Sequence, residues 1–491
     1  MYHAVIGKRL VECVNEHFGR TYTIYEFFNE IYAPLFFGSA KILQHVGNSP
    51  FFQRLNVGTI DYTRKMNEGM SVTQLKKEAK TDAAARYKLG LLYYEGEGVG
   101  RNKTEAQKWF YKATKLCVKE INKKINDSAP DASFFLGGPA AGIDNTTSGQ
   151  VTSMQIPITR EDIYASWLGA ACGMTVEGGF TILIDSKDVL LAIFEGWKEY
   201  RNYLNQTSQL KPLQINTWNG QWVTYKMRGL SDKFAPNAKT EKGVSKLVTQ
   251  SWIQLLFALS FHFNESQDPL LAYVYSLGKM NRTIGFVKLN LPSVRRPVDF
   301  YNKLFTVPDG LPAYAFEELY QTETAFEKAC LMTEIGLRAI KPKDIFNADN
   351  KVPKPPTNVK TKLASKEENI AYAKKKLAFQ TYQTWIIAML NNKDLYQHAN
   401  DLAKALQRFQ QQSTRGKTTR KQMVQEILDK KNLRDFIDVL TGIVNEDDSE
   451  RATFEQIVID ILALPVEKVP LFLTLVRFSY AVTEKQKEVS S

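Results

Sequence analysis

Apolar residues recur at every third or fourth position through the C-terminal part of the chain, a spacing typical of amphipathic helices that pack together. Polar turns and the pair Pro465 and Pro470 interrupt the pattern, so it divides into short segments. We therefore predict a small all-helical bundle over residues 377–482. Its helices are expected at residues 377–390, 395–411, 420–428, 433–444, 453–464 and 470–482.

The pattern before residue 341 is mixed. Short apolar runs of strand length alternate with longer segments of helical spacing, which predicts a body with both strands and helices. Strands are expected at residues 180–184 and 284–290, and helices at residues 22–36, 187–204, 252–263 and 311–340.

The dipeptide Asn219-Gly220 lies between Trp218 and Trp222. Asn-Gly is the preferred centre of a two-residue type I′ turn, because both residues tolerate positive φ angles. We therefore predict a β-hairpin over residues 215–225. The predicted fold class is α+β, a mixed N-terminal body with a β-hairpin, followed by a C-terminal all-helical bundle.

A lysine- and proline-rich stretch separates the two patterns. Residues 341–376 contain repeated Lys and Pro and little apolar periodicity, which is typical of a linker between domains. The predicted organisation is a mixed body at 1–340, a basic linker at 341–376 and the bundle at 377–482.

Small residues follow a regular spacing between residues 85 and 113. Glycines at the centre of the segment predict a turn, and small residues on both sides let two helices approach closely. The pattern resembles a single SEL-like, tetratricopeptide-related repeat, which usually has Asp where Asn102 stands. The resemblance implies a helical hairpin over 85–125 that serves as an insertion or docking element. It is carried by Ala85, Leu89, Gly90, Tyr93, Gly96, Gly98, Val99, Asn102, Ala106, Trp109 and Ala113.

The charge balance favours a polyanionic partner. The 491 residues include 64 Lys and Arg against 52 Asp and Glu, so the formal net charge is +12. Nucleic acid is the first candidate for such a partner, ahead of a membrane surface. The longest apolar run, at residues 252–263, is too short to span a bilayer, and the chain starts without a leader pattern. We expect a cytoplasmic protein without membrane contact.

The four cysteines are far apart and form no C-x-x-C pair. This spacing argues against a zinc ribbon or a disulfide framework and fits a reducing compartment. Cys13 and His17 could share a helix face, but two ligands make only half of a zinc site. We expect buried structural residues at these positions, and no metal or cofactor.

Basic residues gather in one stretch of the predicted bundle, opposed only by Glu426 and Asp429. A solvated helix face is one explanation; a groove that follows nucleic-acid phosphates is the functional alternative. The candidate residues are Lys404, Arg408, Arg415, Lys417, Arg420, Lys421, Lys430, Lys431 and Arg434.

A glycine-rich polar loop is the second candidate interface. Short Asn, Thr, Ser and Gln side chains on a flexible backbone can approach base edges or phosphates, although an ordinary surface loop has the same composition. Arginines elsewhere add candidate phosphate contacts. These candidates are Asn145, Thr146, Thr147, Ser148, Gln150, Arg282, Arg295 and Arg296.

Catalytic signatures are scarce. The sequence has no P-loop, dinucleotide fingerprint or H-E-x-x-H, and we expect His262 to be a core residue, so no catalytic residue is predicted. The alternative is a Mg²⁺-dependent nuclease that uses Asp162, Asp185 and Lys187, because a strand ending in Asp-x-Lys is the minimal form of such a core. Asp-Ser-Lys also fits a helix N-cap, which we prefer.

The plan of a mixed body, an Asn/Thr/Ser/Gly loop and a C-terminal helical module resembles the large subunit of CRISPR type I interference complexes (Cascade). The resemblance covers most of the chain and implies a non-catalytic subunit. Its partners would be guide RNA, target DNA and the other subunits of a ribonucleoprotein complex. The body would inspect the DNA that flanks the target, and the helical module would line the displaced strand. A protein–protein adaptor that docks through residues 85–113 is a further alternative.

Overall fold

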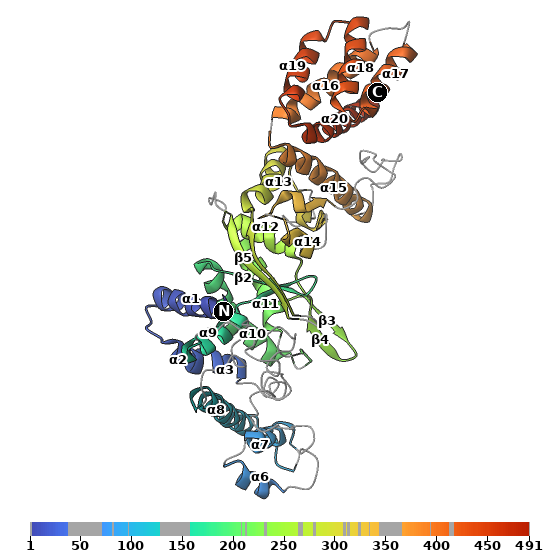
Figure 1. The fold of residues 1–491 in the computed structure, drawn as a ribbon. Coiled ribbons are helices and arrows are strands. Elements are labelled where there is room, and N and C mark those ends of the chain that lie inside the picture. Colours follow the sequence, from blue (N-terminus) through green and yellow to red (C-terminus); the bar gives the residue numbers. More distant parts are fainter. Residues whose placement is uncertain are drawn as a thin grey trace. The chain divides into compact units, whose positions relative to one another are not determined.

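The chain forms two compact units, seen in a computed structural model (Figure 1). The first comprises Met1–His262 and Leu270–Lys288, and the second Phe263–Pro269 and Leu289–Ser491. The structure describes residues 2–37, 71–80, 83–96, 98–127, 158–207, 209–211, 214–229, 233–263, 269–277, 281–307, 311, 315–322, 326–332, 334–342, 366–392, 394–411 and 417–490.

The first unit combines many helices with short strands, as the mixed pattern predicted. Its helices are α1 (Tyr2–Phe18), α2 (Ile24–Phe27), the π-helical η1 (Phe28–Tyr32), α3 (Ala33–Phe37), α6 (Val72–Glu78), α7 (Ala83–Glu95), α8 (Lys103–Asp127), α9 (Arg160–Ala171), α10 (Lys187–Gln206), α11 (Ile215–Arg228) and α12 (Trp252–His262). The strands before residue 290 are β1 (Met174–Val176), β2 (Phe180–Ile184), β3 (Ala238–Glu241), β4 (Val244–Leu247), β5 (Leu270–Leu277) and β6 (Asn281–Leu289). The predicted strands at 180–184 and 284–290 and the buried helix at 252–263 are confirmed.

Strands β1, β2, β5 and β6 lie in that order in one sheet. β1 pairs with β2, and β2 with β5, both antiparallel, so that Leu183 lies opposite Tyr273. The tight β1–β2 turn depends on Gly178 and Gly179, whose φ angles of 89° and 77° favour glycine. Every residue of β2 is buried, which explains its uninterrupted apolar sequence.

Helices α1 and α9 pack at close backbone distance. A Cβ atom at Gly7 would lie 1.8 Å from the Ala165 carbonyl oxygen, and one at Gly169 would lie 1.8 Å from the His3 carbonyl oxygen. Only glycine fits at these two positions, because such distances are far inside van der Waals contact. The crossing fixes α1, whose charged face lines the pocket described below.

The predicted hairpin at residues 215–225 is wrong, because this segment lies within helix α11 and starts at its first residue. Asn219 is fully buried, and its Nδ2 donates to the Ala171 carbonyl at 2.7 Å and the Gly173 carbonyl at 2.9 Å. A Cβ atom at Gly220 would lie 2.8 Å from the Thr175 carbonyl oxygen. Asn-Gly therefore serves helix packing, and these tertiary contacts override the local turn preference.

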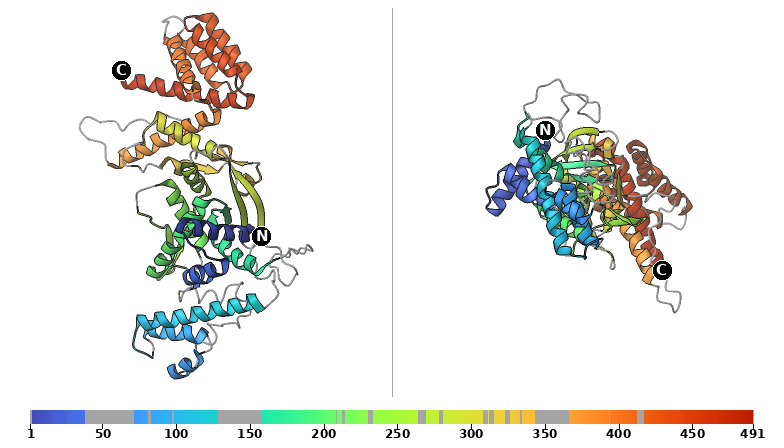
Figure 2. Two further views of the ribbon diagram at one scale, coloured as in Figure 1. Left: turned by 90° about the vertical axis from the view of Figure 1, so that its left-hand side faces the viewer. Right: turned by 90° about the horizontal axis from the view of Figure 1, so that it is seen from below.

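The predicted helical hairpin is confirmed in α7 and α8, which lie side by side (Figures 1 and 2). Gly90 of α7 faces the Phe110 ring of α8, where a Cβ atom would approach within 2.5 Å. The turn uses Gly96 and Gly98, with φ angles of 85° and 67°. Asn102 accepts a hydrogen bond from the Glu105 backbone N–H at 3.0 Å, so the amide caps the start of α8 as Asp would.

The second unit begins with α13 (Leu291–Leu304) and continues through short elements. These are η4 (Ala315–Leu319), β7 (Tyr320–Thr322), α14 (Phe326–Cys330), β8 (Glu334–Ile335), η5 (Leu337–Ala339) and β9 (Ile340–Pro342). The helix predicted over 311–340 is therefore wrong. Its apolar spacing comes from buried residues on separate short turns and strands, including Phe316, Ala329 and Ile335.

Long helices complete this unit: α15 (Lys366–Leu390), α16 (Asp394–Gln411), α17 (Lys417–Asp429), α18 (Leu433–Glu446), α19 (Arg451–Leu462) and α20 (Val469–Ser490), with the 3₁₀ turn η6 (Val466–Lys468) before α20. The predicted bundle helices are thus confirmed. Residues 366–376, expected as linker, are helical. Tyr301 of α13 donates to Gln380 of α15 at 3.1 Å, which ties residues before the expected linker to those after it.

Candidate functional site

Part of the predicted interface lies outside the described residues. This holds for the polar loop with Asn145, Thr146, Thr147, Ser148 and Gln150, and for Arg415. These residues stay predictions. Lys417 opens helix α17, but its side chain is not described.

The three remaining arginines of the predicted body interface belong to different units. Arg282 is exposed on β6 in the first unit. Arg295 and Arg296 are half-buried on α13 in the second unit, and Arg295 pairs with Asp299 at 3.1 Å. The pairing makes Arg295 a weaker phosphate contact than predicted.

Two arginines of the predicted basic surface have internal partners. Arg420 is 9% exposed, donates to Asp447 at 3.0 Å and lies 4.7 Å from the Phe409 ring centroid. Arg408 makes a bidentate contact with Glu450, with 2.8 Å between Nη2 and Oε2. Arg420 therefore has internal partners, and its role in phosphate binding stays a prediction. The acidic α18–α19 connection, distant in sequence, folds against both guanidinium groups.

The Asp447 carboxylate of this connection is held in its charged form. Asp447 accepts the Ser449 backbone N–H at 3.0 Å, and this bond, with that from Arg420, holds the pKa of Asp447 below its ordinary value. The hydrogen bond to Glu450 raises the pKa of Arg408. These pairs stabilise the bundle instead of offering charge to a ligand.

Other basic residues of the bundle remain at the surface. Lys430 pairs with Glu426 at 3.0 Å within one helical turn. Lys404, Lys421, Lys431 and Arg434 are exposed, and none of them pairs with a carboxylate in the described part of the chain. These four are the candidates for phosphate contact that the fold leaves available.

The three groups of the nuclease alternative each contact helix α1. Asp162 pairs with Lys8, with 2.8 Å between Oδ1 and Nζ, and forms the capping box of α9 together with Thr159. Burial works to raise the pKa of Asp162, but the bonds from Lys8 and Thr159 hold it below its ordinary value. Asp185 lies 3.5 Å from Arg9, and Lys187 lies 2.9 Å from Glu16.

Within the described residues no three or more His, Cys, Asp or Glu side chains are grouped as metal ligands. Ser186 occupies the N-cap position of α10, the interpretation that we preferred for Asp-Ser-Lys, although its side chain makes no capping bond.

Cys13 is buried, as expected, and burial raises the pKa of its thiol, whereas His17 is exposed. His262 is also exposed and lies 2.9 Å from Asp188, so the expected core histidine is wrong. It ends α12, where the helix leaves the core.

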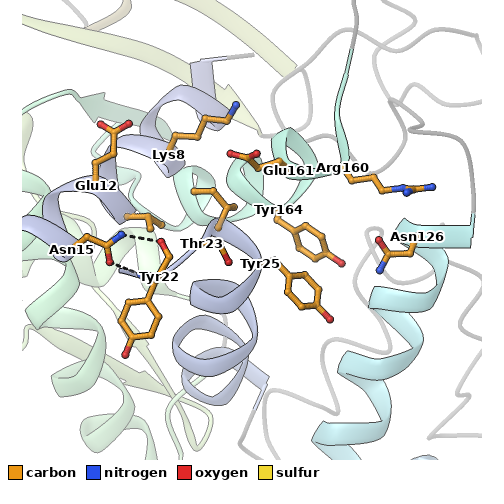
Figure 3. Close-up of a pocket in the computed structure, with 12 residues that line it drawn as sticks. Lys8, Glu12, Asn15, Tyr22, Thr23, Tyr25, Asn126, Arg160, Glu161 and Tyr164 are labelled. Carbon is orange, nitrogen blue, oxygen red and sulfur yellow. Dashed lines mark hydrogen bonds between the residues drawn. The ribbon is translucent and has the colours of Figure 1, made fainter. Parts of the chain in front are cut away.

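A pocket lies beside α1, α2 and α9, with the end of α8 at its edge (Figure 3). Its volume is about 550 Å³, and it is lined by both charge types and by tyrosines. The lining side chains include Lys8, Glu12, Asn15, Tyr22, Tyr25, Asn126, Arg160, Glu161 and Tyr164.

Internal hydrogen bonds hold the pocket wall in place. Asn15 and the Tyr22 backbone exchange two bonds, of 2.8 and 2.9 Å, shown as dashed lines in Figure 3. Tyr25 and Tyr164 meet edge to face with 5.5 Å between ring centroids. Burial, and then the neighbouring Tyr25, raise the pKa of Tyr164, which keeps its hydroxyl protonated. The wall includes both cations and carboxylates.

No pattern in the sequence predicts this pocket. Its residues come from four helices and from the connection between α1 and α2, they are separated by up to about a third of the chain, and none forms a local motif. No helix in the described part of the chain is long and apolar enough to cross a membrane.

Comparisons with protein-family models, curated proteins and solved structures found no match to this chain.

Proposed function

We propose that the chain is a non-catalytic nucleic-acid-binding subunit of an RNA-guided ribonucleoprotein complex of the CRISPR type I kind. In this role it would contact guide RNA and the DNA that flanks the target. Its C-terminal bundle would support the displaced strand. The proposal includes other subunits of the same complex as partners.

The observation that carries the proposal is the sorting of charge in the bundle. The fold pairs Arg408 and Arg420 with acidic residues but leaves Lys404, Lys421 and Lys431 exposed without carboxylate partners among the described residues. Exposed, unneutralised cations on a chain of net charge +12 favour a polyanion. Lysines contact phosphates without reading sequence, which suits a subunit that leaves sequence recognition to base pairing.

A further run of exposed lysines supports the same role. Lys374, Lys375 and Lys376 are consecutive residues in the N-terminal half of α15, and none has a carboxylate partner in the described part of the chain. They belong to the stretch that was expected to be a linker. Helical structure gives this run a fixed position in the second unit.

The test measures binding of single-stranded and duplex oligonucleotides to the full chain by fluorescence anisotropy at several salt concentrations. The variant replaces Lys404, Lys421, Lys431 and Arg434 with Gln. The matched control replaces four exposed lysines of the first unit, Lys198, Lys239, Lys242 and Lys246, with Gln. We expect the bundle variant to lose at least tenfold in affinity at low salt and the control to lose much less.

The proposal fails if the wild-type chain binds no oligonucleotide at low salt, or if both variants bind equally well. Its finer part is tested by purifying the tagged chain from its native host and sequencing any bound nucleic acid. A discrete short RNA with repeat-derived ends, together with constant partner proteins, is the expected result. A nucleic-acid-free chain with a salt-insensitive protein partner would favour the adaptor alternative.

A further inference from the structure

Helix α8 carries a straight row of lysines on one face. Lys108, Lys112, Lys115, Lys119 and Lys123 follow one another at intervals of four, three, four and four residues, and all five are exposed. Residues at this spacing stack on the same side of a helix. At about 1.5 Å per residue the row extends about 22 Å along the helix axis. We call these five residues the α8 lysine row.

The opposite face of α8 is the packing face of the helical hairpin. Ala106 and Ala113 are fully buried, and Phe110 fits against Gly90 of α7. This packing fixes which face of α8 meets solvent. The lysine row is therefore a constant feature of the hairpin surface and does not depend on side-chain rearrangement.

The described carboxylates do not neutralise the charge around the row. Residues 71–127 contain 13 Lys and Arg against 7 Asp and Glu, so this stretch supplies half of the net charge of +12. Glu105 pairs with Lys108 at 2.8 Å at one end of the row. The bond to Lys108, and then the nearby lysine charges, lower the pKa of Glu105. Lys112, Lys115, Lys119 and Lys123 have no carboxylate partner among the described residues.

Aromatic rings stand beside the row. The Nζ of Lys112 lies 4.5 Å from the Trp109 ring centroid, and the Nζ of Lys115 lies 4.7 Å from that of Tyr111. Such contacts orient the ammonium groups while leaving them able to donate hydrogen bonds. Tyr111 is 57% exposed, although large aromatic side chains usually bury most of their surface. Exposed aromatic rings next to cations are typical of surfaces that bind single-stranded nucleic acid.

We propose that the α8 lysine row binds the sugar-phosphate backbone of a single-stranded nucleic acid. The helical hairpin of α7 and α8 is then a nucleic-acid-binding arm, not a protein-docking element. A single narrow row matches one line of phosphates. A helix inserted in the major groove of a duplex, which is about 12 Å wide, would need cations on both flanks to reach both strands.

The proposal rests on the proposed function for its ligand class but uses residues outside the bundle. Ammonium groups contact phosphate charge and not the 2′-hydroxyl, so RNA and DNA single strands are expected to bind about equally. Like charges at neighbouring positions of one helix face repel each other. Binding of a polyanion removes this repulsion, which adds to the affinity.

The test uses the full chain and fluorescent single-stranded RNA and DNA of mixed sequence. The row variant replaces Lys112, Lys115, Lys119 and Lys123 with Gln. A charge-preserving variant replaces the same residues with Arg. The control removes four lysines from other positions of the same hairpin region, Lys77, Lys80, Lys88 and Lys103, by substitution with Gln.

We expect the row variant to bind at least tenfold more weakly at low salt, with the Arg variant and the control close to wild type. The slope of log K against log salt should become shallower by about 2 to 3, because each single-strand phosphate contact contributes about 0.7. A row variant that binds as well as the control would overturn the inference, as would a preference for duplex. Equal affinity for poly-glutamate would also overturn it, by favouring an acidic protein.

Failure of the two proposals can be distinguished in the same assay. If the wild-type chain binds single strands and only the bundle variant loses affinity, the lysine row is not a binding surface and the proposed function stands. If the wild-type chain binds no nucleic acid, the proposed function itself fails. Far-UV circular dichroism of each variant checks that the substitutions leave the helices intact.

Discussion

Two basic regions of this chain differ in whether the fold supplies them with acidic partners. In the bundle, Arg408 and Arg420 contact Glu450 and Asp447, carboxylates that lie at least 27 residues away in sequence. On α8, the charges of Lys112 to Lys123 have no such partner among the described residues, and the hairpin packing directs them to solvent. A basic run in a sequence therefore remains an exposed cationic surface only where the fold brings no acidic segment against it.

Among the substitutions that test this contrast, the removal of Arg420 should have the largest effect on stability. Arg420→Ala leaves Asp447, which is 19% exposed, without its guanidinium partner and removes the stacking on Phe409. We expect the free energy of unfolding of the second unit to fall by about 3 kcal/mol, as for other nearly buried ion pairs that lose one partner. Urea denaturation measures it, with the exposed neighbour substitution Lys421→Gln as control. Equal, small effects of both substitutions would show that Arg420 is not structural.

Acid should weaken the same pair. The pKa of Asp447 in the folded chain is below its ordinary value, so its stabilising contribution is present above an ordinary carboxyl pKa near about 4. The contribution is lost as the pH falls through the lower, folded value. At pH 7 we expect Asp447→Asn to be less stable than wild type by about 1.5 kcal/mol, as for a hydrogen bond to a charged group. The difference should shrink below about pH 4. A difference that does not change with pH would contradict this account.

Arg408→Gln should cost less than either change, because this ion pair is more exposed. The Arg408 side chain is 51% exposed, so solvent screens its contact with Glu450. We expect a loss of about 0.5–1 kcal/mol at low salt, which diminishes in 1 M salt. Thermal unfolding at two salt concentrations measures it. A loss as large as that of Arg420→Ala would mean that burial does not separate the two arginines.

Substitution of the α8 lysine row should have the smallest effect on stability, and the effect should be a gain where the other substitutions cause a loss. Each like-charge pair at neighbouring positions of one helix face costs about 0.2–0.5 kcal/mol at low salt. Substitution of Lys112, Lys115, Lys119 and Lys123 with Gln should therefore leave α8 as stable or slightly more stable. High salt should abolish the difference. Clear destabilisation in hydrogen exchange of the α8 amides would show that these lysines have structural partners.

The sequence predicted the elements that local patterns determine. The bundle helices follow from apolar periodicity, and strand β2 from an apolar run that is buried on every residue. The α7–α8 hairpin follows from small residues and glycines at fixed spacing. The α8 lysine row also has a regular spacing of three and four residues in the sequence, but the basic residues of the bundle are closer together and therefore gave the stronger local signal.

Long-range contacts explain what the sequence could not predict. Asn219-Gly220 has the local signature of a turn, yet the carbonyls of residues 171–175 hold it inside a helix. Arg420 has the local signature of a surface cation, yet the acidic α18–α19 connection covers it. The pocket beside α1 and α9 depends on helices that only the tertiary fold brings together.

The central claim is that the cations left unpaired by the fold bind nucleic acid. The most direct measurement is the affinity of the full chain for a single-stranded oligonucleotide between about 50 and 200 mM salt, with phosphate contacts counted from the slope. The account predicts a linear fall of log K against log salt with a slope of at least about −3, as for four or more contacts. Absence of binding at low salt, or an affinity that salt does not change, would contradict it.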